Sequence, residues 1–105
     1  MQFTSFLDDG SLTVALTGEI DHHCAKAYID AVANKIEVYL PRECILDFQQ
    51  VSFMDSSGIA VVINALRRMN QAGGRLLLEG LGSQPMRVLN AAGIEKIVEI
   101  REAVR

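Results

Sequence analysis

Segments typical of β-strands alternate with segments of helical periodicity along most of this 105-residue chain. Such alternation predicts an α/β fold in which helices connect the strands of a partly parallel sheet. Two strand-like segments flank Asp8-Asp9-Gly10, and an Asp-Gly pair in that position predicts a β-hairpin, so the sheet is expected to be mixed. In order, we expect strands at 3–7 and 11–17, a helix from Asp21 that ends before Pro41, a strand at 44–48, a helix from Asp55 to about Ala72, a strand at 75–79, a short helix from Pro85 to near Gly93, and a last strand within 94–100.

Composition limits the classes of protein to which the chain can belong. Half of the residues are hydrophobic, so one domain of this length can bury a core, mostly of Val, Ile, Leu and Ala because aromatic residues are scarce. The net charge of −3 argues against nucleic-acid binding, which needs a basic surface. No apolar run approaches the roughly 20 residues of a membrane span and no secretory signal is visible, so we expect no membrane association and a cytoplasmic location. In that reducing compartment Cys24 and Cys44 are expected to be free thiols.

Helical periodicity predicts which faces of the two longer helices are buried. In the first helix the apolar stripe consists of Ala25, Tyr28, Ile29, Val32 and Ile36. In the second helix it consists of Ile59, Val62, Ile63, Leu66 and Met69. Outside that second stripe, a solvent-exposed helix face would be expected to carry charged residues. Four positions there are small or apolar instead, namely Ala60, Val61, Asn64 and Ala65. A helix flank of that kind suits a partner surface.

The sequence lacks the motifs of the common enzyme classes. Met54 and Asp55 occupy positions where a hydrolase nucleophile elbow needs glycine, and no phosphate-binding Gly-x-x-x-x-Gly-Lys loop is present. The run from His22 to Cys24, together with Cys44, offers metal-ligating groups, but consecutive residues point in different directions on a helix and do not converge on one ion. We therefore expect a binding protein, not an enzyme, without metal or cofactor.

The segment Asp55-Ser56-Ser57-Gly58 places two serines at the start of the second helix. Asp and Ser at such a position are ordinary N-caps, worth roughly 1 kcal/mol, but three cap-type residues followed by glycine are more than one helix start needs. A phosphate here would meet free backbone N–H groups and the positive end of the helix dipole. It would also add about −1.5 to −2 charge beside Asp55. Asp21 would be close to this charge as well if the strand end that carries it lies beside the second helix. The segment therefore suits a switch in which phosphorylation ends partner binding while the fold persists, and helix geometry does not choose between Ser56 and Ser57.

Two spaced motifs carry a family resemblance. Gly18-Glu19-Ile20-Asp21-His22-His23 and Phe53-Met54-Asp55-Ser56-Ser57-Gly58 together resemble the anti-sigma factor antagonists, which consist of a single STAS domain. The Asp-His-His run is most similar to the sporulation members of the family, the anti-sigma F factor antagonists. The resemblance extends from about residue 10 to about residue 100. It implies one STAS domain over residues 1–105, with a mixed, mostly parallel sheet of four to five strands and helices packed mainly on one side.

The resemblance also implies a regulatory function. In this family the unphosphorylated antagonist binds an anti-sigma factor that is a serine kinase, and the sigma factor is released. The kinase then phosphorylates the antagonist, which dissociates, and a phosphatase restores it. The implied acceptor is the residue after the Asp, here Ser56, with Ser57 as the fallback. The implied partner-binding residues are Asp21, Asp55, Ser57, Gly58, Ala60 and Asn64. No cofactor is implied, and the free protein is expected to be a monomer.

The sequence departs from the family pattern in the second helix and at the C-terminus. Sporulation members tend to carry glycine at the positions of Ala60 and Asn64 and arginine at that of Ala65, so a kinase backbone is expected to approach this helix differently. Few residues follow Ile100, so a final helix that relatives often possess is expected to be missing or reduced. The alternative interpretation is a STAS regulatory module with a different protein partner, in a stress complex or in lipid transport. The acceptor serine argues for the antagonist, because several such modules lack one.

Overall fold

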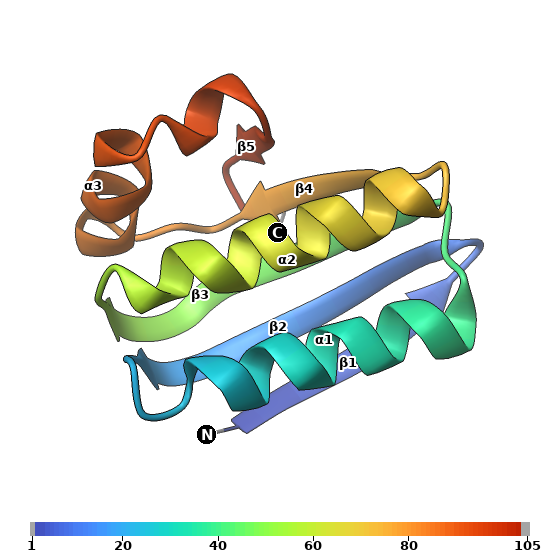
Figure 1. The fold of residues 1–105 in the computed structure, drawn as a ribbon, viewed down its shortest axis with the longest axis horizontal. Helices are drawn as coiled ribbons and strands as arrows, with labels where there is room; N and C mark the ends of the chain where they lie inside the picture. The colour runs from blue at the N-terminus through green and yellow to red at the C-terminus, as the bar shows by residue number, and fades with distance from the viewer. Residues whose placement is uncertain (1, 104–105) are drawn as a thin grey trace.

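A five-stranded mixed sheet in the order β1-β2-β3-β4-β5 organises the computed structural model, which describes residues 2–103 (Figure 1). β1 is antiparallel to β2, and every other pair of neighbours is parallel. The strands are β1 (Gln2–Asp8), β2 (Ser11–Ile20), β3 (Glu43–Met54), β4 (Arg75–Glu79) and β5 (Glu99–Arg101). The helices are α1 (Ala25–Tyr39), α2 (Ser57–Gln71), α3 (Ser83–Ala91) and the short 3₁₀ helix η1 (Ile94–Lys96). The predicted α/β class, mixed sheet and order of elements are confirmed.

The hairpin between β1 and β2 forms at the predicted position. Asp9 and Gly10 make a two-residue turn between the paired residues Asp8 and Ser11. Both turn residues have positive φ, 51° and 81°. Such a turn matches the twist of the two strands, and Asp-Gly is a pair that tolerates this backbone conformation. The hairpin therefore supplies the one antiparallel pair of the sheet.

Helices α1 and α2 lie side by side on one face of the sheet, in front of it in Figure 1. Each connects two parallel neighbours, α1 between β2 and β3 and α2 between β3 and β4. An ion pair between Glu37 of α1 and Arg68 of α2 links the two helices. α3 and η1 lie beyond β4 in the same view. Within residues 2–103, every helix is too short or too polar to cross a membrane.

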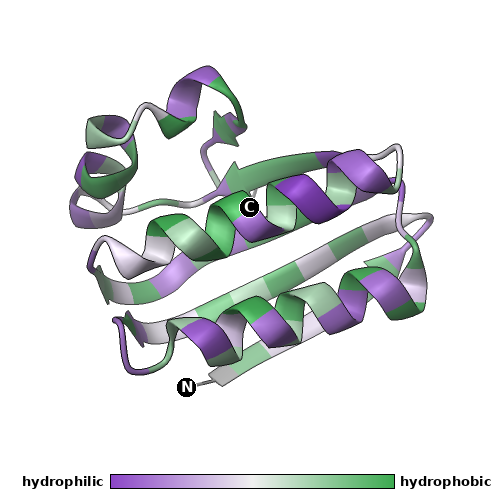
Figure 2. Ribbon diagram, viewed as in Figure 1, coloured by the Kyte–Doolittle hydropathy of each residue, from purple (hydrophilic) through white to green (hydrophobic). Residues whose placement is uncertain are grey.

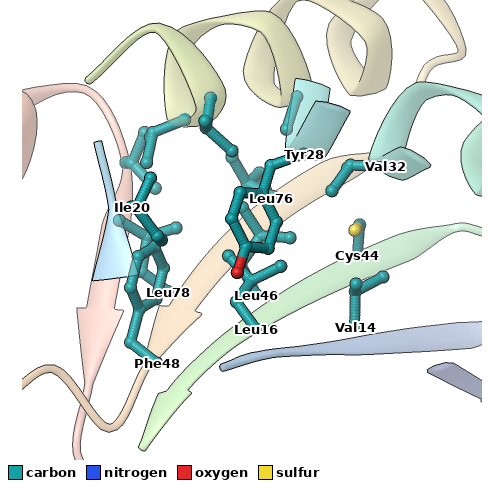
Figure 3. Close-up of a cluster of buried hydrophobic side chains, with 14 of the residues drawn as sticks. Val14, Leu16, Ile20, Tyr28, Val32, Cys44, Leu46, Phe48, Leu76 and Leu78 are labelled. Carbon is teal, nitrogen blue, oxygen red and sulfur yellow. The ribbon is translucent and has the colours of Figure 1, made fainter. Parts of the chain in front are cut away.

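The hydrophobic core lies between the sheet and the helices. Alternate residues of β2, such as Val14 and Leu16, are fully buried because successive side chains of a strand point to opposite faces. Figure 3 shows Tyr28 reaching from α1 toward the sheet within this cluster, and its hydroxyl donates to the carbonyl of Thr17. The centre of β4 is hydrophobic throughout (Figure 2), and Leu76 to Leu78 are all buried. Interior parallel strands are apolar in this way because both of their faces are covered.

β3 is longer than the predicted strand at 44–48, because the segment up to Met54 also belongs to the strand. β2 continues to Ile20 and pairs with this segment, with Glu19 opposite Phe53 and Ile20 opposite Met54. Two register shifts within β2 accompany this extended pairing. As a result β2 and β3 end together, and the residues that follow them lie at the same edge of the sheet.

The buried face of α2 is confirmed only in part, because Val62 and Met69 of the predicted stripe are buried but its other three members are not. Its buried residues are Gly58, Val61, Val62, Ala65 and Met69, whereas Ile59, Ile63 and Leu66 are only half-buried. The helix carries two overlapping apolar stripes, and the prediction favoured the one with the larger side chains. The smaller side chains face the sheet because the helix lies close to β3. Val61 and Ala65, which were expected on an exposed flank, are therefore part of the core.

α1 begins at Ala25, after a turn at 22–24, and not at Asp21 as predicted. Its predicted stripe is otherwise confirmed, because Ala25, Tyr28, Val32 and Ile36 are buried and Ile29 is half-buried. At the other end of the chain β5 ends at Arg101. The prediction about a final helix extends to residues that lie outside the described part of the chain.

Candidate functional site

The segments that follow β2 and β3 meet at one end of the sheet. Ile20 pairs with Met54 at the carboxyl ends of these parallel strands. The N–H of Asp55 donates to the carbonyl of Ile20 over 3.1 Å, so the start of α2 is joined to the turn before α1. Both turns lie at the left end of the sheet in Figure 1. The structure thus brings Asp21 and Asp55, which are far apart in sequence, to one edge of the molecule.

The carboxylate of Asp55 links the two turns. Its Oδ1 accepts from the N–H of Ser57 over 2.8 Å, which caps the first turn of α2. Its Oδ2 accepts from the N–H of His22 over 3.2 Å, and the Nδ1 of the same histidine lies 3.8 Å away. The side chain of Asp55 therefore orders both the start of α2 and the neighbouring turn.

Asp21 holds the turn before α1 in a similar way. Its carboxylate accepts from the backbone N–H of His23 over 3.0 Å and of Cys24 over 3.3 Å. The thiol of Cys24 lies 3.4 Å from the same oxygen. This thiol contact first, and then the two backbone N–H groups, hold the pKa of Asp21 below its ordinary value of 3.8. Asp21 is therefore a carboxylate at neutral pH, and it acts as a cap although the regular helix starts later.

The two serines of the site differ in accessibility. Ser56 is exposed, directly precedes the first residue of α2, and makes no side-chain capping hydrogen bond. Ser57 is half-buried, and its N–H is already bonded to Asp55. The hydroxyl at the surface of this helix start is thus that of Ser56.

The backbone amides at the start of α2 are not free, contrary to the expectation from sequence. The N–H of Ser57 donates to the side chain of Asp55, that of Gly58 to the carbonyl of Asp55 over 3.0 Å, and that of Ile59 to the carbonyl of Ser56 over 3.1 Å. These amides have partners because the helix begins with a tight turn that Asp55 caps. A phosphate on Ser56 would therefore remain at the surface and would not be enclosed by backbone donors.

The other predicted partner-binding residues fall into two groups. Gly58 is buried, and a Cβ there would lie 2.3 Å from Cγ and Sδ of Met54, so this glycine lets α2 approach the end of β3. Ala60 is exposed one turn after Ser56, and Asn64 is half-buried one turn further on. The Oδ1 of Asn64 is buried without a hydrogen-bond partner among the described residues.

Sequence reasoning missed one contact at the site, that of Gln84 in α3 with the backbone of Met54. Pro85 was the only signal recognised in that segment, and no local pattern reveals a contact across thirty positions of the chain. Cys24 and Cys44 are both free thiols. Among residues 2–103, no group of three or more His, Cys, Asp or Glu side chains is arranged to hold a metal ion.

Comparison with known proteins places the chain in a family. The model of the STAS domain matches residues 7–105, so the chain belongs to the STAS domain family. Within that family, the anti-sigma-B factor antagonist of Listeria monocytogenes is 32% identical, with 90% of this chain and 82% of that protein covered. The anti-sigma F factor antagonist of Paenibacillus polymyxa is 34% identical, with 87% and 78% covered. The predicted resemblance to the anti-sigma factor antagonists is confirmed.

Solved structures show the same fold. The anti-sigma factor antagonist SpoIIAA in its unphosphorylated form is 24% identical and gives a TM-score of 0.84, with 99% of this chain and 90% of that chain covered. The Bacillus cell fate determinant SpoIIAA in its phosphorylated form gives a TM-score of 0.76 at 24% identity, with 99% and 93% covered. These similarities confirm the STAS-type fold of the chain.

Proposed function

We propose that the chain is an anti-sigma factor antagonist whose unphosphorylated form binds an anti-sigma serine kinase and thereby releases a sigma factor. Phosphorylation of Ser56 ends that binding, and a phosphatase restores it. The chain itself is a regulatory substrate in the cytoplasm, not an enzyme. Family membership and the names of the relatives support the proposal. The observation that carries it is the exposed Ser56 at the start of α2, next to Asp55 and at the same edge as Asp21.

The proposed kinase-binding surface runs from the turn before α1 along the first turns of α2. Asp21 and Asp55 contribute negative charge, and both carboxylates are held by backbone N–H groups. Ala60 presents only a methyl group one turn from Ser56, which leaves room for a partner to approach the helix. Ser57 and Asn64 are half-buried and Gly58 is buried, so these three residues add little side-chain surface for a partner. Gly58 acts by letting the start of the helix pack against Met54.

Charge explains how phosphorylation would end binding. A phosphate adds about −1.5 to −2 charge, and the occupied amides of α2 leave it at the surface beside Asp55 and at the same edge of the sheet as Asp21. Two like unit charges 4 Å apart repel by about 1 kcal/mol in water and by about 4 kcal/mol at an effective dielectric constant of 20. Repulsion between this phosphate and an acidic group of the partner would therefore weaken binding, for each unit of charge, by about fivefold at the lower value and by roughly a thousandfold at the higher value. The domain stays folded because the added charge contacts no buried group.

The test is phosphorylation by a purified anti-sigma kinase encoded next to this protein, with ATP and mass spectrometry to locate the phosphate. Ser56→Ala is the test variant and Ser57→Ala is the matched control. We expect one phosphate on the wild type and on Ser57→Ala, and none on Ser56→Ala. Binding to the kinase in the presence of ADP should be retained by all three unphosphorylated proteins and lost by the phosphorylated wild type.

Each other outcome has a defined meaning. Phosphate on Ser57 would keep the mechanism and correct the acceptor residue. An absence of both transfer and ADP-dependent binding would refute the antagonist function. It would favour a STAS module that regulates a different partner, in a stress complex or in lipid transport.

A further inference from the structure

The end of β3 that carries the site has one edge without a neighbouring strand. β2 pairs with β3 as far as Met54, but β4 pairs with it only from Glu43 to Asp47. Backbone groups on the β4 side beyond that point therefore need water or partners from elsewhere in the molecule. The last residue of β3, directly before Asp55, is where such a partner is found.

The side-chain amide of Gln84, in the first turn of α3, supplies that partner. Its Oε1 accepts from the N–H of Met54 over 2.9 Å, and its Nε2 donates to the carbonyl of Met54 over 2.7 Å. One amide thus takes the place of a peptide unit of an adjacent strand. Reversing the amide would put donor against donor and acceptor against acceptor, so the two contacts define its orientation.

Met54 is the residue through which the start of α2 is anchored. Its side chain is fully buried, and Gly58 packs directly on it. Its backbone is held by Gln84 on the β4 side and is paired with Ile20 of β2 on the other. Asp55 and the acceptor serine follow immediately. A shift of the Met54 peptide would therefore move the whole start of α2.

We propose that Gln84 is a positioning residue for the phosphoacceptor, which acts by fixing the backbone of Met54 and hence the place of Ser56 relative to the β2–α1 turn. The inference rests on the proposed function and extends it to a residue on a different helix. The turn before α1 restrains the acceptor segment from one side, through Ile20 and Asp55. Gln84 restrains it from the other side, in a half-buried position where water competes less for the amide.

The first test does not involve the kinase. Amide hydrogen exchange is measured at Met54 in the wild type, in Gln84→Ala, in Gln84→Glu and in Asn90→Ala, which removes an exposed amide from the same helix. Loss of one hydrogen bond should speed exchange at Met54 by roughly two- to tenfold in Gln84→Ala. Gln84→Glu keeps an acceptor for the Met54 N–H but puts a second acceptor oxygen against the Met54 carbonyl, so its exchange rate should lie between those of Gln84→Ala and the wild type. Asn90→Ala should exchange at the wild-type rate. Unchanged exchange in Gln84→Ala would remove the positioning role.

The second test separates positioning from docking and from stability. Phosphorylation by the kinase is measured as kcat and KM for each variant, with the folded fraction of each taken from thermal unfolding. Gln84→Ala should lower kcat by about tenfold with KM changed less than about twofold, because the acceptor hydroxyl is misplaced while the binding surface is intact. Gln84→Glu, which loses the bond to the Met54 carbonyl, should fall between Gln84→Ala and the wild type. Asn90→Ala should match the wild type.

The results that contradict the inference differ from those that contradict the proposed function. A kcat for Gln84→Ala equal to that of Asn90→Ala, or a rise in KM alone, would overturn the positioning role while leaving the switch at Ser56 in place. Failure of the wild type to be phosphorylated would overturn the proposed function, and the positioning role with it. In that case the exchange measurement would still report whether Gln84 holds the Met54 peptide.

Discussion

Replacing Gly58 with alanine would place a methyl carbon 2.3 Å from both Cγ and Sδ of Met54. Ordinary contacts of a Cβ begin at 3.4 Å, so the helix and the methionine cannot both keep their positions. Met54 is fully buried beneath the start of α2, which leaves its side chain little space to move. The substitution therefore tests whether the close approach of α2 to β3 depends on this glycine.

The expected loss of stability is the difference between two effects. Overpacking a buried site costs about 1–3 kcal/mol. Alanine in place of glycine favours the helix by up to about 1 kcal/mol. Because the clash involves Cγ and Sδ in the middle of the Met54 side chain and not only its flexible end, we expect Gly58→Ala to lower the free energy of unfolding by about 1–2 kcal/mol.

A double-mutant cycle with Met54→Ala identifies the cause. Met54→Ala alone should cost about 2–5 kcal/mol, because it leaves a cavity under α2. In that background the methyl group at position 58 has room, so Gly58→Ala should become neutral or stabilising, with a coupling energy of about 1–3 kcal/mol. Urea unfolding followed by circular dichroism gives the four free energies. Additivity within about 0.5 kcal/mol would refute the steric argument.

Three further predictions concern the rest of the domain. Burial raises the pKa of Cys44 to about 12, so this thiol should not react with iodoacetamide at about pH 8 until urea is added. Cys24 is half-exposed and should react in the folded protein. Labelling of Cys44 in the folded protein would contradict this prediction. The hydroxyl of Ser11 donates to Glu43 over 2.8 Å and lowers the pKa of that carboxyl below its ordinary 4.5, so the stabilisation is present above that value and is lost as the pH falls through the lower folded-state pKa. Glu43→Gln should therefore lose less stability than the wild type when urea unfolding is repeated below about pH 4, and an identical pH profile would exclude the effect. Finally, Val61→Ala should destabilise the protein more than Ile63→Ala although it removes a smaller group, because Val61 is fully buried and Ile63 is half-buried; the opposite order of unfolding free energies would restore the predicted helix face.

Local patterns were sufficient where a conformation depends on nearby residues. The hairpin at Asp9-Gly10 followed from the tolerance of these two residues for positive φ. The buried stripe of α1 followed because a single helical face is strongly apolar. The capping residues Asp21 and Asp55 followed from short side chains that reach backbone N–H groups within three positions.

Local patterns failed where the outcome depends on how closely two elements pack. In α2 the larger apolar residues suggested one face, but Gly58 and Ala65 allow an approach to the sheet that Ile59 and Ile63 would prevent. The extension of β3 depended on β2 continuing beside it, which is a pairing between distant segments.

The sequence by itself determined the class of fold, the order of elements, the family and the segment in which the candidate acceptor serine lies. These features depend on periodicity, turn residues and two short motifs, all of which are local. Only the tertiary structure decided that Ser56 is exposed while Ser57 is half-buried, and that the amides beside them are already bonded. It also brought Gln84 to the end of β3. The physical reason is that accessibility and hydrogen-bond partners are set by neighbours distant along the chain, and these are specified only when the sheet and helices pack together.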